Sequence, residues 1–158
     1  MNIASIGLGD IAQKAYLPLI TQMKKVAPYF CTSTESTLQQ LAEKYRVNNL
    51  YRSVDELLKE DLDAAFVHAA TEAHYSIVKK LLQEKIPTFV DKPITYHLEK
   101  TEELIALAEK NETILMTGFN RRYVPTYRSL LEIEDPKTII MEKNRTYQPG
   151  DPRGFIMD

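Results

Sequence analysis

Short apolar runs rich in β-branched and aromatic residues alternate with longer amphipathic stretches along most of the chain. This alternation is typical of βαβ units, in which parallel strands form one sheet with helices on both faces. The apolar runs predict six strands, at residues 2–6, 29–32, 50–51, 64–68, 88–90 and 114–117. The pattern therefore predicts an α/β fold with a doubly wound, mostly parallel sheet.

Two of the longer stretches have the apolar spacing of amphipathic helices. Side chains recur at i, i+3, i+4 and i+7, which places them on one helical face. They are Leu38, Leu41, Ala42 and Tyr45 in the first stretch, and Leu104, Leu107 and Ala108 in the second. Each stretch is expected to pack its apolar face on the sheet.

Local signals predict where several helices begin. Ser36 with Gln39 and Ser53 with Glu56 match the capping box, in which two side chains satisfy the first free amides of a helix. Pro18 is expected in the first turn of a helix that follows a glycine loop, because its missing N–H costs little there.

The pattern changes after Gly118, and this predicts a boundary between a first domain, residues 1–118, and a second segment, residues 119–158. The second segment reads as a helix at 123–133, a strand at 138–144 and a loop or frayed tail at 148–158. No later strand accompanies residues 138–144. Since an unpaired apolar edge favours pairing, we expect this strand to fold back or to join a second copy in a homo-oligomer.

Composition narrows the class of protein. Among 158 residues, 44% are hydrophobic and the 20 Lys and Arg nearly balance the 22 Asp and Glu, so nothing indicates disorder or a nucleic-acid partner. A single cysteine, Cys31, excludes an internal disulfide and suits a reducing cytoplasm. It forms no zinc-ligand pattern with the three histidines, so no metal site is predicted. No apolar run approaches the roughly 20 residues of a membrane span.

The first candidate site follows the first predicted strand. Gly7, Gly9, Asp10, Ile11 and Ala12 lie in a G-x-G-x-x-A sequence between a strand and a helix, as in Rossmann domains that bind a dinucleotide. There the glycines allow a tight turn and let the pyrophosphate approach bare amides at a helix N-terminus. The alternative is that these glycines serve an ordinary turn.

The second strand ends where such domains usually carry an acid that binds the adenosine ribose. Here the residues are Thr32, Ser33 and Thr34, whose hydroxyls leave room for a 2′-phosphate. We therefore favour NADP over NAD, although no Arg or Lys is adjacent and Glu35 is the residue that could reverse the preference. In the alternative interpretation, Ser33 and Thr34 cap the next helix.

Further candidates follow strand four, where ligands of open α/β sheets bind. Ala69, Ala70 and Thr71 are small enough to let a nicotinamide ribose lie against the strand end. His74 could donate a hydrogen bond to cofactor or substrate, although an exposed histidine in a first helical turn is usually inert.

Polar residues also follow strands five and six. Asp91, Lys92 and Pro93 follow strand five, where the lysine could hydrogen-bond a substrate hydroxyl or assist its loss of a proton. Asn120 and Arg121 follow strand six and could face the same crevice. A surface lysine and a solvated pair of arginines are the alternatives.

The order of these four signals resembles the Gfo/Idh/MocA family of oxidoreductases over residues 1–145. Its members carry a glycine loop and T-P-N-x-x-H, E-K-P and G-F-N-R-R segments, which correspond here to Thr71–His74, Asp91–Pro93 and Gly118–Arg122. The resemblance implies that Lys92 is the catalytic lysine, with Asn120 and Arg121 near the nicotinamide. Asp91 departs from the glutamate of the motif.

The resemblance also implies hydride transfer between NAD(P) and a hydroxy compound such as a sugar or polyol. Members of the family are longer and carry a second α+β domain with a catalytic histidine, and no histidine here follows Arg122. We therefore expect a truncated oxidoreductase that binds cofactor but is inactive alone. A non-catalytic dinucleotide-binding or interaction module is the alternative, and a domain that binds nothing is a third interpretation.

Overall fold

The computed structural model describes residues 1–140 and 142. The chain divides into two compact units, Met1–Gly118 and Phe119–Asp158, and each is described by itself. The first unit contains the sheet and the helices that cover it.

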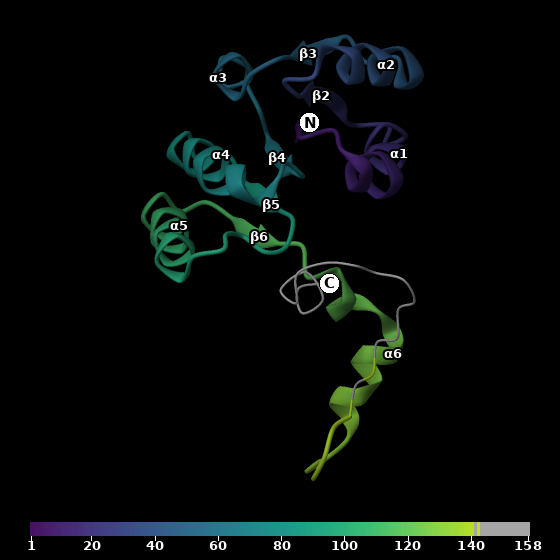
Figure 1. Ribbon diagram of the computed structural model, residues 1–158, viewed down its shortest axis with the longest axis vertical. Coiled ribbons are helices and arrows are strands. Elements are labelled where there is room, and N and C mark those ends of the chain that lie inside the picture. The colour runs from purple at the N-terminus through teal and green to yellow at the C-terminus, as the bar shows by residue number, and fades with distance from the viewer. Residues whose placement is uncertain (141, 143–158) are drawn as a thin grey trace. The chain divides into compact units, whose positions relative to one another are not determined.

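Six parallel strands form the sheet of the first unit, in the order β3-β2-β1-β4-β5-β6 (Figure 1). The strands are β1 (Asn2–Ile6), β2 (Ala27–Cys31), β3 (Asn49–Tyr51), β4 (Ala64–Val67), β5 (Thr88–Val90) and β6 (Leu115–Thr117). The order reverses between β1 and β4, and such a switch point leaves a crevice at the carboxyl ends of the strands. The predicted doubly wound parallel sheet is confirmed.

Strand β2 begins two residues before its predicted start and includes Pro28, a residue that sequence patterns exclude from a central strand. The amide of Ala27 points to β1, where it donates to the carbonyl of Met1 at 2.8 Å. Neighbouring amides alternate in direction, so the N–H that Pro28 lacks would point to β3. That strand begins only opposite Tyr29, so the missing donor costs no ladder bond.

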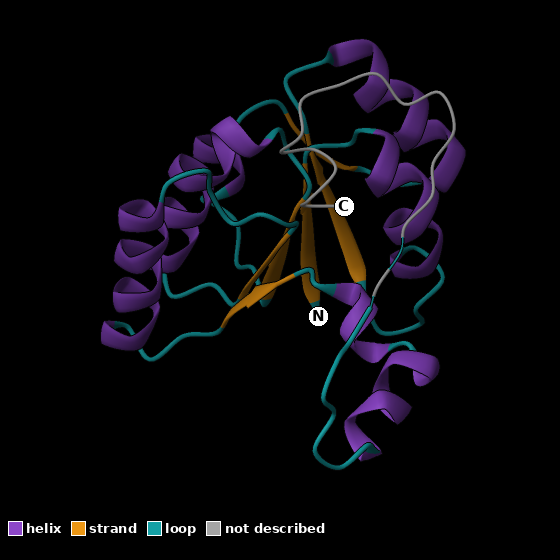
Figure 2. Cartoon of the chain, turned by 60° about the horizontal axis from the view of Figure 1, so that its bottom comes forward, coloured by secondary structure: helices purple, strands orange, loops and turns teal. Residues whose placement is uncertain are grey.

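Helices cover both faces of the sheet (Figure 2). After β1 come η1 (Ala12–Tyr16, a π-helical turn) and α1 (Leu17–Ile20), and then α2 (Glu35–Tyr45), α3 (Val54–Leu57), α4 (Thr71–Gln83) and α5 (Leu98–Lys110). One buried cluster joins the sheet to α3, α4 and α5, and the other joins it to the first helices and α2. The predicted apolar faces are confirmed, since Leu38, Leu41 and Leu104 are buried.

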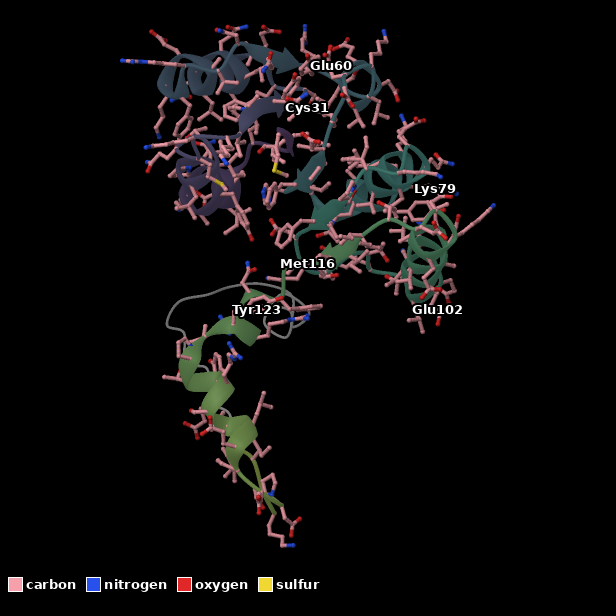
Figure 3. All side chains as sticks on the ribbon, turned by 180° about the vertical axis from the view of Figure 1, so that it is seen from behind. Cys31, Glu60, Lys79, Glu102, Met116 and Tyr123 are labelled. Atoms are coloured by element: carbon pink, nitrogen blue, oxygen red, sulfur yellow. The ribbon has the colours of Figure 1, made fainter. Side chains whose placement is uncertain are left out.

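An ion pair at the surface joins α4 to α5. The ammonium of Lys79, a residue labelled in Figure 3, lies 2.6 Å from Glu103 and donates to the Tyr75 hydroxyl. These hydrogen bonds raise the pKa of Lys79 and lower that of Glu103. Both groups are solvent-exposed, so the cluster contributes little beside the buried leucines between the two helices.

Of the two predicted capping boxes, one forms in part. Ser53 is the N-cap of α3, and its hydroxyl accepts the amide of Glu56 at 3.2 Å, whereas the Glu56 carboxylate accepts the amide of Arg52. The box at Ser36 is wrong. Helix α2 begins at Glu35, two residues before the start that a Ser36 cap predicts, with Thr34 in the extended N-cap conformation, so Ser36 already lies inside the first turn.

Pro18 lies in the first turn of α1, as predicted, but α1 does not begin after a loop. It continues directly from η1, and both Tyr16 and Leu17 have right-handed helical angles at the junction. A proline removes one helical hydrogen bond, and widening of the preceding turn relieves its steric conflict with the preceding carbonyl.

The second unit differs most from prediction. In place of one helix at 123–133 it contains η2 (Asn120–Tyr123), α6 (Pro125–Arg128) and η3 (Ser129–Glu132). Val124 is extended, as residues before proline usually are, and this interrupts the helix. The predicted strand at 138–144 is not formed at 138–140, where no partner strand pairs with it, while 141, 143–144 and the predicted tail at 148–158 lie outside the described residues.

Candidate functional site

A cleft of about 490 Å³ lies at the switch point of the sheet, beyond the carboxyl ends of β1, β2 and β4. Its walls come from the glycine loop, from the segments after β2 and β3, and from the segment that leads into α4. The lining residues are Ile6, Gly7, Leu8, Gly9, Cys31, Thr32, Ser33, Arg52, Ser53, Val54, His68, Ala69, Ala70, Ala73 and Ile77. The fold therefore brings segments far apart in sequence to one crevice.

The glycine loop depends on its first glycine. Gly7 has a φ of +83°, and a Cβ there would lie 2.4 Å from the amide nitrogen of Ala69. Its own amide donates to the carbonyl of Cys31 at 2.9 Å. A glycine is thus required at Gly7 because the loops after β1 and β4 are in backbone contact.

The second glycine faces open space. A Cβ on Gly9 would meet no atom within 4 Å, and the Gly9 carbonyl accepts the amide of Gln13 as the helix begins. Ala12 is fully buried and packs this turn against the sheet. Asp10 and Ile11 are exposed beside the loop, and Asp10 pairs with Lys14 at 2.8 Å. A bare backbone at a helix start can hold a pyrophosphate, so the geometry fits a dinucleotide.

The segment after β2 contributes Thr32 and Ser33 to the cleft, whereas Thr34 does not line it. Thr34 occupies the N-cap of α2 without a side-chain capping bond, so the capping interpretation holds for its backbone only. The hydroxyl of Thr32 accepts the amide of Thr34 at a long 3.5 Å.

Sequence reasoning missed Arg52, which lines the same part of the cleft. Cys31 and Tyr51 are partners in the parallel ladder of β2 and β3, so the residues that follow them lie side by side. Arg52 Nε lies 3.0 Å from Glu35 Oε2. The prediction that no Arg or Lys is adjacent to Thr32, Ser33 and Thr34 is correct for the sequence, but in the folded chain Arg52 lies beside Thr32 and Ser33.

Small residues follow β4 and form one wall of the cleft. Ala69 and Ala70 line it, and Thr71 begins α4 without being part of the wall. The fold therefore leaves this side of the cleft without bulky side chains.

His74 is buried, in contrast to an exposed first-turn histidine. Its Nδ1 lies 2.9 Å from the carbonyl of Pro93, and its Nε2 lies 2.8 Å from the carbonyl of Ala69. Carbonyls only accept, so a neutral ring donates to one of them at a time. His74 thus joins the loop after β4 to the loop after β5.

A second histidine, absent from the predicted site, lies at the end of β4. The His68 ring is fully buried, and its Nδ1 lies 2.8 Å from Oδ2 of Asp91, whose side chain is 18% exposed. A carboxylate only accepts, so Nδ1 carries the proton of this bond. Nε2 has no hydrogen-bond partner among the described residues. The Tyr16 ring lies over the imidazole, with centroids 4.1 Å apart.

Lys92 follows Asp91 directly and is half-buried. The Lys92–Pro93 peptide bond is cis, and the carbonyl of Pro93 is the one that His74 contacts. Asp91, Lys92 and Pro93 do not line the cleft themselves. Their loop is fixed at both ends, by His68 on Asp91 and by His74 on Pro93.

Asn120 and Arg121 lie in η2 of the second unit, whereas the residues that line the cleft all belong to the first unit. Gly118 ends the first unit beside β5. A Cβ on it would lie 2.9 Å from the Phe89 ring and 3.2 Å from Asp91 Oδ1.

Cys31 lines the cleft as a buried thiol (Figure 3). Burial, aided by the charge of Glu56, raises its pKa to about 12, so the nucleophilic thiolate is scarce at neutral pH. The residues that the structure describes contain no group of three His, Cys, Asp or Glu side chains that could hold a metal ion. None of their helices is both long and apolar enough to cross a membrane.

A doubly wound sheet with a glycine loop at its switch point defines the class of Rossmann domains. The sequence profile described as "Oxidoreductase family, NAD-binding Rossmann fold" (GFO_IDH_MocA) matches residues 1–119. The chain belongs to this Gfo/Idh/MocA family.

Named relatives and solved structures agree with this assignment. YceM of Salmonella typhimurium, provisionally named an oxidoreductase, is 36% identical over 100% of this chain and 52% of its own. The myo-inositol dehydrogenase Hyg17 of Streptomyces leeuwenhoekii is 32% identical over 82% of this chain and 40% of its own. A family oxidoreductase from Vibrio cholerae superimposes with a TM-score of 0.79 at 42% identity, covering 84% of this chain and 42% of its own. This chain thus spans about half the length of such relatives.

Proposed function

We propose that this chain binds a nicotinamide dinucleotide in the cleft, with NADP favoured over NAD, as the cofactor-binding part of an oxidoreductase. The observation that carries the proposal is the glycine loop. Gly7 is locked against Ala69 while Gly9 leaves its backbone open to the cleft. That combination suits a pyrophosphate at a helix start.

In this proposal each wall of the cleft binds a different part of the dinucleotide. The amides near Gly9 bind the pyrophosphate, the hydroxyls of Thr32 and Ser33 bind the adenosine ribose or its phosphate, and Ala69 and Ala70 leave space for the nicotinamide ribose. The dinucleotide supplies the chemistry of accepting or donating a hydride. The loop held by His68 and His74 sets the position of Lys92.

Lys92 is the residue proposed to act on the substrate. Its ammonium would hydrogen-bond a hydroxyl of a sugar-like or polyol-like substrate and ease its loss of a proton. The name of one relative, a myo-inositol dehydrogenase, fits this substrate class. Asn120 and Arg121 would contribute near the nicotinamide. The chain spans about half the length of its relatives, so we propose turnover for a protein of the relatives' length and expect a reducing cytoplasm as its location.

Thermal unfolding with and without NADPH and NADH tests the cofactor proposal. A ligand at 100 times its dissociation constant should stabilise the fold by about 2.7 kcal/mol, which raises the melting temperature by several degrees. We expect the larger shift with NADPH. No shift with either dinucleotide at saturating concentration would contradict the proposal.

Lys92→Ala separates the enzyme from the alternative of a non-catalytic dinucleotide-binding module. For an enzyme, hydride transfer from a panel of polyols to NADP⁺, measured in a protein of the relatives' length that contains this chain, falls by about 100-fold or more while the dissociation constant of NADPH stays nearly constant. Absorbance of the reduced nicotinamide and a binding titration measure the two quantities. If such a protein with the wild-type lysine binds NADPH but transfers no hydride, the result favours the module.

A further inference from the structure

One residue of the cleft wall, Arg52, belongs to an ion pair that the sequence alone does not reveal. Arg52 follows β3 and Glu35 begins α2, and they meet beside Thr32 and Ser33 because β2 and β3 are parallel neighbours. Arg52 lines the part of the cleft proposed to hold the adenosine ribose, and Glu35 lies against Arg52. A cation and an anion therefore compete for the position that distinguishes NADP from NAD.

The backbone of Arg52 is held while its side chain is accessible. Its amide donates to Glu56 Oε2 at 3.1 Å, and the next residue, Ser53, caps α3. The side chains of Arg52 and Glu35 are 63% and 51% exposed. An exposed ion pair contributes little to stability, so a ligand can replace either partner at small cost.

The guanidinium geometry suits a phosphate in this position. The contact with Glu35 uses Nε, and a guanidinium can offer its Nη edge to a further acceptor. Arginine binds phosphate through two parallel hydrogen bonds, which a hydroxyl cannot match. A ribose 2′-hydroxyl is instead a donor that a carboxylate such as Glu35 accepts.

We propose that Arg52 is the specificity-determining residue that binds the 2′-phosphate of NADP, and that Glu35 limits this preference by holding the guanidinium. The inference rests on the proposed dinucleotide site and assigns its choice between cofactors. Glu35 weakens phosphate binding in two ways. Its negative charge repels the phosphate, and its ion pair with Arg52 occupies part of the guanidinium. With NADH, Glu35 accepts the ribose hydroxyl and Arg52 makes no essential contact.

Arg52→Gln in the full chain tests the first half of this proposal, with dissociation constants of NADPH and NADH measured by fluorescence titration. We expect NADPH to bind about ten- to a hundred-fold more weakly, as for the loss of a hydrogen bond to a charged group, and NADH to change by less than about twofold. Lys59→Gln is the control, because it removes the same charge from an exposed residue outside the cleft.

Glu35→Gln tests the second half. It should tighten NADPH binding by roughly three- to tenfold and weaken NADH binding, and higher salt should reduce the preference for NADPH. Equal weakening of both dinucleotides by Arg52→Gln, or no effect on either, would overturn the inference while wild-type binding upholds the proposed function. If the wild type binds neither NADPH nor NADH, both this inference and the proposed function are overturned.

Discussion

Replacing Gly7 with alanine should destabilise the fold by at least about 3 kcal/mol, through backbone strain and overpacking together. Alanine at a φ of +83° is strained, and its Cβ would lie 2.4 Å from the amide nitrogen of Ala69. The backbones at Gly7 and Ala69 belong to loops that directly follow the buried strands β1 and β4, so neither loop can move without disturbing the sheet. Urea unfolding followed by circular dichroism measures the loss.

Gly9→Ala is the matched control two residues away. Its Cβ meets no atom within 4 Å, so the free energy of unfolding should change by less than about 1 kcal/mol. The same methyl group would lie where the pyrophosphate is proposed to approach, so NADPH binding should fall sharply. Equal stability losses at the two glycines would contradict the contact between the loops after β1 and β4. Unchanged NADPH binding in Gly9→Ala would contradict the phosphate site.

Asp91→Ala should have the second largest effect, a loss of about 2–4 kcal/mol of stability. It removes the hydrogen-bond partner of Nδ1 in the fully buried His68 ring, where Nε2 already has no partner among the described residues. Both ring nitrogens would then be buried without a hydrogen bond. The expected loss is at the lower end for a buried pair because the Asp91 carboxylate is 18% exposed. Chemical denaturation at neutral pH gives the difference.

Two further variants make this prediction specific. Asp55→Ala breaks an exposed ion pair with Lys80 and should cost less than about 1 kcal/mol. His68→Phe places an apolar ring among Tyr16, Phe66 and Phe89. If His68 and Asp91 are energetically coupled, Asp91→Ala should lower the free energy of unfolding by less in the His68→Phe variant than in the wild type. Additive losses would contradict a coupled pair.

Hydrophobic periodicity predicts most of the fold of the first unit. Strand β5 has its predicted bounds, and α2 and α5 bury the leucines that the helical spacing selects. Periodicity fails where a neighbour decides the outcome. Pro28 joins β2 because β3 starts one residue later, and the predicted helix at 123–133 breaks where Pro125 makes Val124 extended.

The sequence by itself determined the parallel sheet, the glycine loop and the membership of an oxidoreductase family, because these depend on local spacing and motif order. Only the tertiary structure decided which side chains meet. It placed Arg52 beside Thr32 and Ser33, and His68 on Asp91, across loops that strand pairing brings together. It also placed His74 inside, between the backbones of two loops. Contacts of this kind depend on sheet order, which a single sequence encodes only through the packing of the whole chain.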